Sequence, residues 1–77
     1  MSHQDLTERQ RDCLRLAAGG MGHQQIGRQL LIGHGTVEAE LARARAKLGA
    51  RNTAHAVGIA MHHGIVTAEH LGLRADA

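Results

Sequence analysis

The side chains best suited to chemistry in this chain are charged and lie between positions 38 and 51. Four basic residues follow one another there with no acidic residue among them: Arg43, Arg45, Lys47 and Arg51. Guanidinium and ammonium groups bind phosphate oxygens, so this run could make about three or four contacts to a polyanion, unless it is simply a solvated face. Glu38 and Glu40 come just before the run, and their carboxylates would repel phosphate. The segment therefore contains features that favour polyanion binding and features that oppose it.

Other kinds of chemistry find little support in the sequence. No two of the seven histidines stand four residues apart beside a third ligand, so we expect no metal and no cofactor. No nucleophile, base and oxyanion donor are grouped together, so we do not expect an enzyme. Cys13 is the only cysteine, and there is neither a signal sequence nor an apolar run of about 20 residues. We therefore expect a cytoplasmic protein without membrane contact.

The length and net charge set further limits. The 77 residues fit one small domain, and domains of this size bury only about 60 per cent of their unfolded surface. Such a domain is marginally stable and could gain from self-association. The formal net charge of +2 does not by itself establish a polyanion partner, although the seven histidines add charge as the pH falls.

Two short helices are predicted in the first half of the chain. Thr7 and Gln10 have the spacing of a capping box, and the helix they begin should run to about Ala18. Its apolar positions, with the residue before the cap, should face a core: Leu6, Cys13, Leu14 and Ala17. Its arginines should remain in water: Arg9, Arg11 and Arg15. A second helix is predicted over residues 23–30, where Gly27 lets a neighbouring backbone approach closely.

The best periodic signal predicts a third helix over residues 34–48. Apolar residues recur there at helical spacing: Val37, Leu41, Ala44 and Leu48. Gly49 should end this helix in the left-handed conformation, and Asn52 should cap a fourth helix that Gly64 closes. The fourth helix should turn these residues inward: Ala56, Val57 and Ala60. The sequence thus predicts an all-α domain over residues 6–66, with an N-terminal arm at 1–5 and a frayed tail at 67–77.

The order of these residues resembles that of one family. The matching segments are LTERQRDCLRLAAGG at 6–20, then Ile26, Leu30, Ile32, Thr36 and Val37, then KLGARN at 47–52, and finally Ala56, Val57 and Gly64. They are similar, without a gap, to the LuxR-type (GerE-like) DNA-binding domain. The resemblance implies a four-helix domain in which the second and third helices form a helix-turn-helix motif. It also implies that the third helix reads the major groove of double-stranded DNA and that the fourth often supports dimerisation.

The resemblance, with the positions of polar side chains on the third helix, gives a set of predicted DNA-binding residues: His34, Thr36, Arg43, Arg45, Lys47 and Arg51. Lys47 matches the family's basic residue before Leu-Gly and would contact phosphate. The helix face opposite the apolar stripe is Gly35, Ala39, Ala42, Arg43 and Ala46. Because only Arg43 on that face can donate to a base edge, we expect low sequence specificity, unless the alanines merely raise helix propensity.

The chain departs from the family pattern at several positions. Glu38 stands where the family usually has Lys or Arg, Glu40 where it often has His, and Gln10 where it usually has Glu. Two glycines replace polar helix caps, and a threonine stands where Arg is common: Gly22, Gly33 and Thr53. The two acids could stabilise the helix by facing the positive end of its dipole, reject DNA, meet a basic partner, or accept a hydrogen bond from cytosine.

These observations support two hypotheses of different classes. The first is a small DNA-binding transcriptional regulator, and the alternative is a LuxR-like protein-interaction module that has lost DNA affinity and pairs with itself or another regulator. A self-association stripe on the fourth helix would consist of His55, Ile59 and His62 and would form a homodimer. This length leaves no room for a receiver or sensor domain, so the chain is expected to work alone or as a detached output module.

Overall fold

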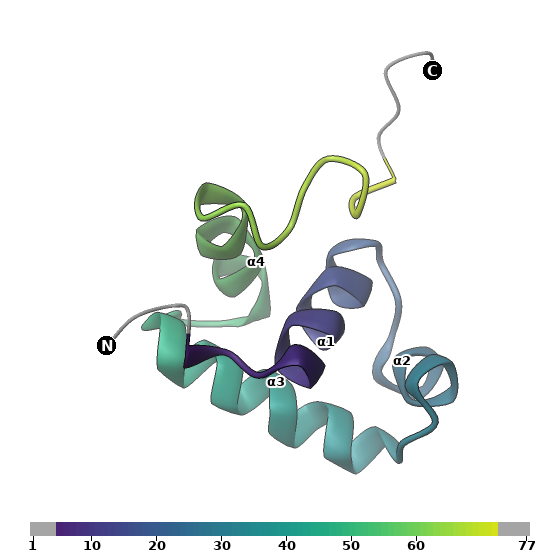
Figure 1. The fold of residues 1–77 in the computed structure, drawn as a ribbon. Coiled ribbons are helices and arrows are strands. Elements are labelled where there is room, and N and C mark those ends of the chain that lie inside the picture. The colour runs from purple at the N-terminus through teal and green to yellow at the C-terminus, as the bar shows by residue number, and fades with distance from the viewer. Residues whose placement is uncertain (1–4, 73–77) are drawn as a thin grey trace.

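The computed structural model describes residues 5–72, and these residues form four helices (Figure 1). The helices are α1 (Glu8–Ala18), α2 (His23–Leu30), α3 (His34–Leu48) and α4 (Thr53–His62). No strand occurs within the described range. The all-α fold of four helices predicted from the sequence is confirmed. Most of the predicted N-terminal arm, residues 1–4, and the end of the predicted tail, residues 73–77, lie outside the described residues.

Helices α1 and α3 each pack against all the other helices, and α2 and α4 lie on opposite sides of α1 in Figure 1. The core that they enclose contains no aromatic side chain, because the sequence has none. Its buried members are aliphatic or small: Leu6, Cys13, Leu14, Ile26, Val37, Leu41, Ala44, Ala56, Ala60 and Val66. The stripe predicted on α3 is therefore buried at three of its four positions, and Leu48 is half-buried.

Most helix ends follow the predicted capping residues, but α4 ends at His62 with His63 as its C-cap, one residue before the predicted Gly64. The Thr7 hydroxyl accepts from the Gln10 backbone N–H at 3.1 Å, and Gln10 Oε1 accepts from the Thr7 N–H at 3.0 Å. Asn52 Oδ1 accepts from the His55 N–H at 2.8 Å at the start of α4. Gly49 ends α3 with φ of 68°, which is the left-handed conformation predicted for it. These local bonds fix where the helices begin and end before any packing is considered.

The turn between α2 and α3 closes tightly against Gly27. A Cβ atom at this position would lie 2.6 Å from the Ile32 carbonyl oxygen, so only glycine fits without a shift of the backbone. The Ile32 N–H donates to the Gly27 carbonyl at 2.8 Å. Between them Leu31 has φ of 61° and is 90% exposed. The close approach predicted at Gly27 is thus confirmed, and the backbone it meets is the turn that leads from α2 into α3.

Two expectations about solvated segments are wrong. Arg11 and Arg15 are half-buried, and Arg15 Nε donates to the Ile65 carbonyl at 2.9 Å, which holds the chain after α4 against α1. Residues 67–72 form turns instead of a frayed end: the Thr67 N–H donates to His70 Nδ1 at 2.8 Å, and Leu71 packs against the core. Apolar contact and a guanidinium anchor, neither visible in a local pattern, order this segment.

None of the helices in the described range combines the length and the apolar character that a membrane crossing requires.

Candidate nucleic-acid interface

The face of α3 that points away from the core is built mainly from residues with little or no side chain. Burial of Val37, Leu41 and Ala44 on one side of the helix leaves the other side in solvent. The exposed residues on that side include Gly35, Thr36, Ala42, Arg43 and Ala46, whereas Ala39 is half-buried. His34 is exposed at the first position of the helix. A flat helix face of this kind can approach another surface closely.

The four basic residues predicted to bind DNA fall into two groups. Arg43 and Arg51 are exposed, and the Arg43 side chain is 62% accessible to solvent. Arg45 and Lys47 are half-buried, and a nitrogen of the Arg45 guanidinium donates to the Thr53 hydroxyl at 3.2 Å. Thr53 stands where the family often has Arg, and it serves here as the acceptor for Arg45. Arg45 and Lys47 are therefore engaged within the domain, and the exposed Arg43 guanidinium also donates to Glu40 Oε1 at 3.2 Å, so three of the four cations have a partner there.

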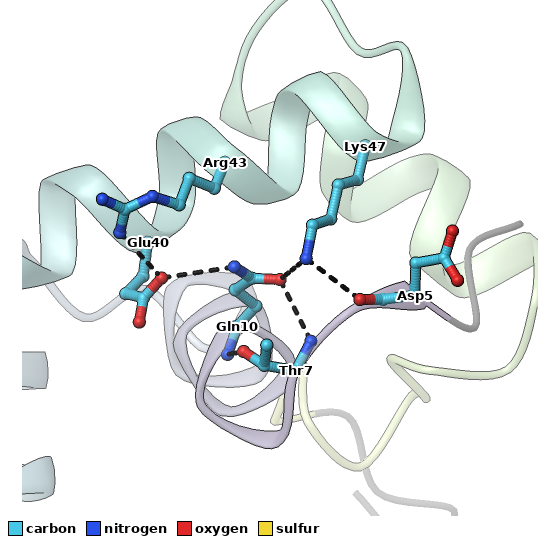
Figure 2. Close-up of polar contacts among 6 residues, drawn as sticks. All are labelled: Asp5, Thr7, Gln10, Glu40, Arg43 and Lys47. Carbon is cyan, nitrogen blue, oxygen red and sulfur yellow. Dashed lines mark hydrogen bonds and ion pairs between the residues drawn. The ribbon is translucent and has the colours of Figure 1, made fainter. Parts of the chain in front are cut away.

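Lys47 joins the last turn of α3 to the start of the described chain (Figure 2). Its Nζ lies 3.0 Å from the Asp5 carbonyl oxygen and 3.0 Å from Gln10 Oε1. The ammonium thus donates to two oxygens on the segment that leads into α1. The phosphate contact predicted for Lys47 would require these bonds to open, and it stays a prediction.

Gln10 lies at the centre of the contact between α1 and α3 and is almost fully buried (Figure 2). Its oxygen accepts from the Thr7 N–H and from Lys47, while its nitrogen donates to Glu40 Oε1 at 3.2 Å. The same Glu40 oxygen accepts from the Arg43 guanidinium at 3.2 Å. We call these four side chains, Gln10, Glu40, Arg43 and Lys47, the inner polar seam. Every polar side-chain atom that is buried within the described residues has a hydrogen-bond partner.

The seam connects two departures from the family pattern that the sequence analysis had treated separately. Where the family usually has an acid on the first helix and often a histidine on the third, this chain has Gln10 on α1 and the acid Glu40 on α3. The two side chains are hydrogen-bonded to each other. Glu40 therefore belongs to the packing of α1 on α3.

Glu38 differs from Glu40 because its side chain is 57% exposed. Its Oε1 lies 3.8 Å from His23 Nδ1 at the start of α2, and His23 is not among the residues predicted from the sequence to form a site. The helix-dipole explanation for the two acids fails, because the first turn of α3 contains no acidic residue and the effect decays within that turn. Arg45 and Lys47 do lie in the last turn, where the dipole favours cations.

Helix α4 presents a different surface from the stripe predicted for it. His55 and His62 are exposed, but Ile59 is half-buried, so the apolar member of the predicted stripe is less accessible than a contact surface requires. The more exposed apolar side chain is Met61, which the helical-wheel argument missed. His55 Nδ1 accepts from the Arg51 backbone N–H at 3.1 Å, which ties the loop before α4 to the helix.

Cys13 is buried in the core, and its burial, with the charges of Glu40 and Asp12, raises the pKa of its thiol. A thiol with a raised pKa is less often ionised and so less nucleophilic. Within residues 5–72, no three side chains of the metal-binding types come together in a way that could hold an ion.

Comparison with known proteins points in the same direction as this geometry. The family model GerE, described as bacterial regulatory proteins of the luxR family, matches residues 4–60. A similar protein is the transcriptional activator protein BjaR1 of Bradyrhizobium diazoefficiens, which is 43% identical over 61 residues. The matched region is 79% of this chain and 25% of that relative, so the chain spans about a quarter of the relative's length. No solved structure shows a significant match to the chain.

Proposed function

Because the chain belongs to the luxR family of bacterial regulatory proteins, we propose that it is a transcriptional regulator that binds double-stranded DNA with α3 in the major groove. The observation that carries the proposal is the outward face of α3. Its small residues let the helix enter a groove about 12 Å wide without a bulky side chain in the way. His34 and Thr36, both exposed near the start of α3, are placed to meet base edges or the backbone.

Affinity in this proposal comes mainly from phosphate contacts. Arg43 is the one residue of the small-residue face that can donate to a guanine edge, so few bases are read directly. Arg51 lies in the exposed loop before α4 and is available to phosphate. Arg45 and Lys47 can add to these contacts only by leaving their partners within the domain. The sequence specificity is therefore low, and the salt dependence is smaller than four free cations would give.

A titration of random duplex DNA, followed by fluorescence anisotropy at several salt concentrations, tests the proposal. We expect micromolar binding, and the logarithm of the association constant should fall with the logarithm of salt concentration with a slope of about minus 2, because Arg43 and Arg51 are exposed. Arg43 would exchange its surface contact with Glu40 for a phosphate. A slope near minus 4 would mean that Arg45 and Lys47 also reach phosphate. The absence of binding at low salt would reject the function.

The alternative, a protein-interaction module, is favoured by one observation, the exposed carboxylate of Glu38 on α3. Because that charge repels phosphate, the face could instead meet a basic protein surface. In that case, no DNA binding would be seen, and Glu38→Lys would not create it.

Self-association through α4 is the proposed dimer contact. The exposed residues of that helix include His55, His62 and Met61. A symmetric dimer would place two copies of this helix together and two copies of α3 toward successive major grooves. Protonation of the histidines would weaken the contact, since like charges would meet. Sedimentation at pH 8 and pH 6 should therefore show more monomer at the lower pH.

A further inference from the structure

His23 and Glu38 form a contact across the helix-turn-helix motif. His23 is the first residue of α2, and Glu38 lies in the second turn of α3. Nδ1 of the histidine is 3.8 Å from Oε1 of the glutamate, and the two side chains are 43% and 57% exposed. Both groups are thus reached by protons and by solutes. They form an ion pair only when the imidazole carries a proton.

The surroundings of this pair contain few other charges. On α3, one helical turn before Glu38, lies the exposed imidazole of His34, and one turn after it lies Ala42. Glu40 is turned toward Gln10 and pairs with Arg43. The only other charged residue of α2 is Arg28.

The charged residues of α1 and α4 that meet α2 and α3 lie away from the His23–Glu38 pair. The charged residues of α1 that border α2 line grooves beside Leu30, at the far end of that helix: Glu8, Arg9, Asp12 and Arg15. That end is about 10 Å from His23, because a helix rises about 1.5 Å per residue. Helix α4 meets α3 near the other end, where Arg45 bonds Thr53. Among residues 5–72, His23 is the ionisable side chain within ion-pair distance of Glu38, and His34 lies one turn away along the same helix.

Building on the proposed function, we propose that proton uptake by His23 controls how strongly α3 binds the phosphate backbone of DNA. When the imidazole is neutral, Glu38 places an uncompensated negative charge on the helix that enters the groove, and phosphates are repelled. When the imidazole is protonated, it pairs with the carboxylate and cancels that charge. Because histidine is the side chain type that changes charge between pH 8 and pH 6, DNA affinity rises as the pH falls over that range.

A double-mutant cycle separates this effect from the general gain of positive charge at low pH. The variants are His23→Gln, Glu38→Gln and the double variant, each titrated with random duplex DNA at pH 8 and pH 6 and one low salt concentration. In the chain that retains His23, Glu38→Gln should tighten binding about fivefold at pH 8 but by less than about twofold at pH 6. In the His23→Gln background the gain should be about the same at both pH values.

His34→Gln serves as the matched control, because His34 is the other imidazole beside Glu38. In the His34→Gln background, the gain in DNA affinity from Glu38→Gln should still be larger at pH 8 than at pH 6. All the side chains that are changed are exposed, so thermal melting should show that every variant folds.

An equal gain from Glu38→Gln at both pH values, in the chain with His23, overturns the inference. The inference is also overturned if the gain from Glu38→Gln still depends on pH in the His23→Gln background but no longer does so in the His34→Gln background. The proton would then act through the other histidine. Binding without the pH coupling removes this inference alone. The absence of DNA binding by all variants at both pH values removes the proposed function as well.

Discussion

Glu38 and Glu40 stand two positions apart on α3 but lie in different environments. The Glu40 side chain is 15% exposed and accepts hydrogen bonds from Gln10 and Arg43 within the inner polar seam. Glu38 is 57% exposed, on the solvent side, and its ion pair forms only when His23 is protonated. One acid supports the packing of α1 on α3, and the other determines the charge of the surface proposed to meet DNA. Two acids that stand close together in a sequence therefore need not have a common role.

The same division applies to the basic residues. Lys47 and Arg45 are half-buried and hold α3 to neighbouring segments, whereas Arg43 and Arg51 are exposed. Arg43 lies at the outer edge of the inner polar seam, where it donates to Glu40. A helix of 15 residues thus carries a structural side and a surface side that share the same kinds of charge. Substitutions confined to one of these two sides should therefore affect either stability or DNA binding, but not both.

The largest effect is expected from the core next to the seam. Leu41→Ala removes a side chain that is 1% exposed, and the resulting cavity should lower the free energy of unfolding by about 2–5 kcal/mol. Ala42→Ser, one residue further on the exposed face, should change it by less than about 0.5 kcal/mol. Chemical denaturation of both variants measures the difference. Similar losses for the two would mean that α3 does not bury the side described here.

A smaller effect is expected from the seam itself. Gln10→Glu places a second carboxylate against Glu40 in a buried position, so it should lower the free energy of unfolding by about 1–3 kcal/mol. Adding Glu40→Gln should recover most of this loss, because one acid and one amide would face each other again and Lys47 would keep a partner. Denaturation of the single and double variants provides the test. A double variant no more stable than Gln10→Glu would contradict the pairing.

The smallest effect is expected on the salt dependence of DNA binding, which should distinguish the exposed Arg51 from the half-buried Lys47. Arg51→Ala should reduce the salt slope of DNA binding by about 1, since it removes one phosphate contact. Lys47→Met should leave that slope unchanged, although the loss of its two hydrogen bonds should lower thermal stability. Anisotropy titrations over a range of salt concentrations give both slopes. If Lys47→Met lowered the slope by the same amount, the ammonium would have to leave Asp5 and Gln10 when DNA binds.

The sequence predicted the helices well because their signals are local. The bounds of α2 and α3 agree with the predicted residues 23–30 and 34–48. Thr7 and Asn52 begin helices through their side-chain caps, and Gly49 ends α3 in the left-handed conformation. The periodic stripe of α3 also identified its buried side.

The candidate interface was less predictable because it depends on distant contacts. Gln10 forms hydrogen bonds with Glu40 and Lys47, which follow it by 30 and 37 positions in the sequence. No periodicity reveals pairs so far apart. The exposure of Ile59 was misjudged because α4 is apolar on most of its surface, so a helical wheel does not separate an inner from an outer side clearly. His23 was overlooked because its partner lies on another helix.

The burial of Cys13 has a practical consequence. Because the chain's only thiol is shielded in the native state and its pKa is raised, a maleimide or disulfide reagent can modify it only when the domain opens. The rate of that reaction therefore reports the opening of the domain, without the need to introduce a cysteine. For the same reason, a cysteine introduced on the surface would be labelled selectively while the native one remains in place.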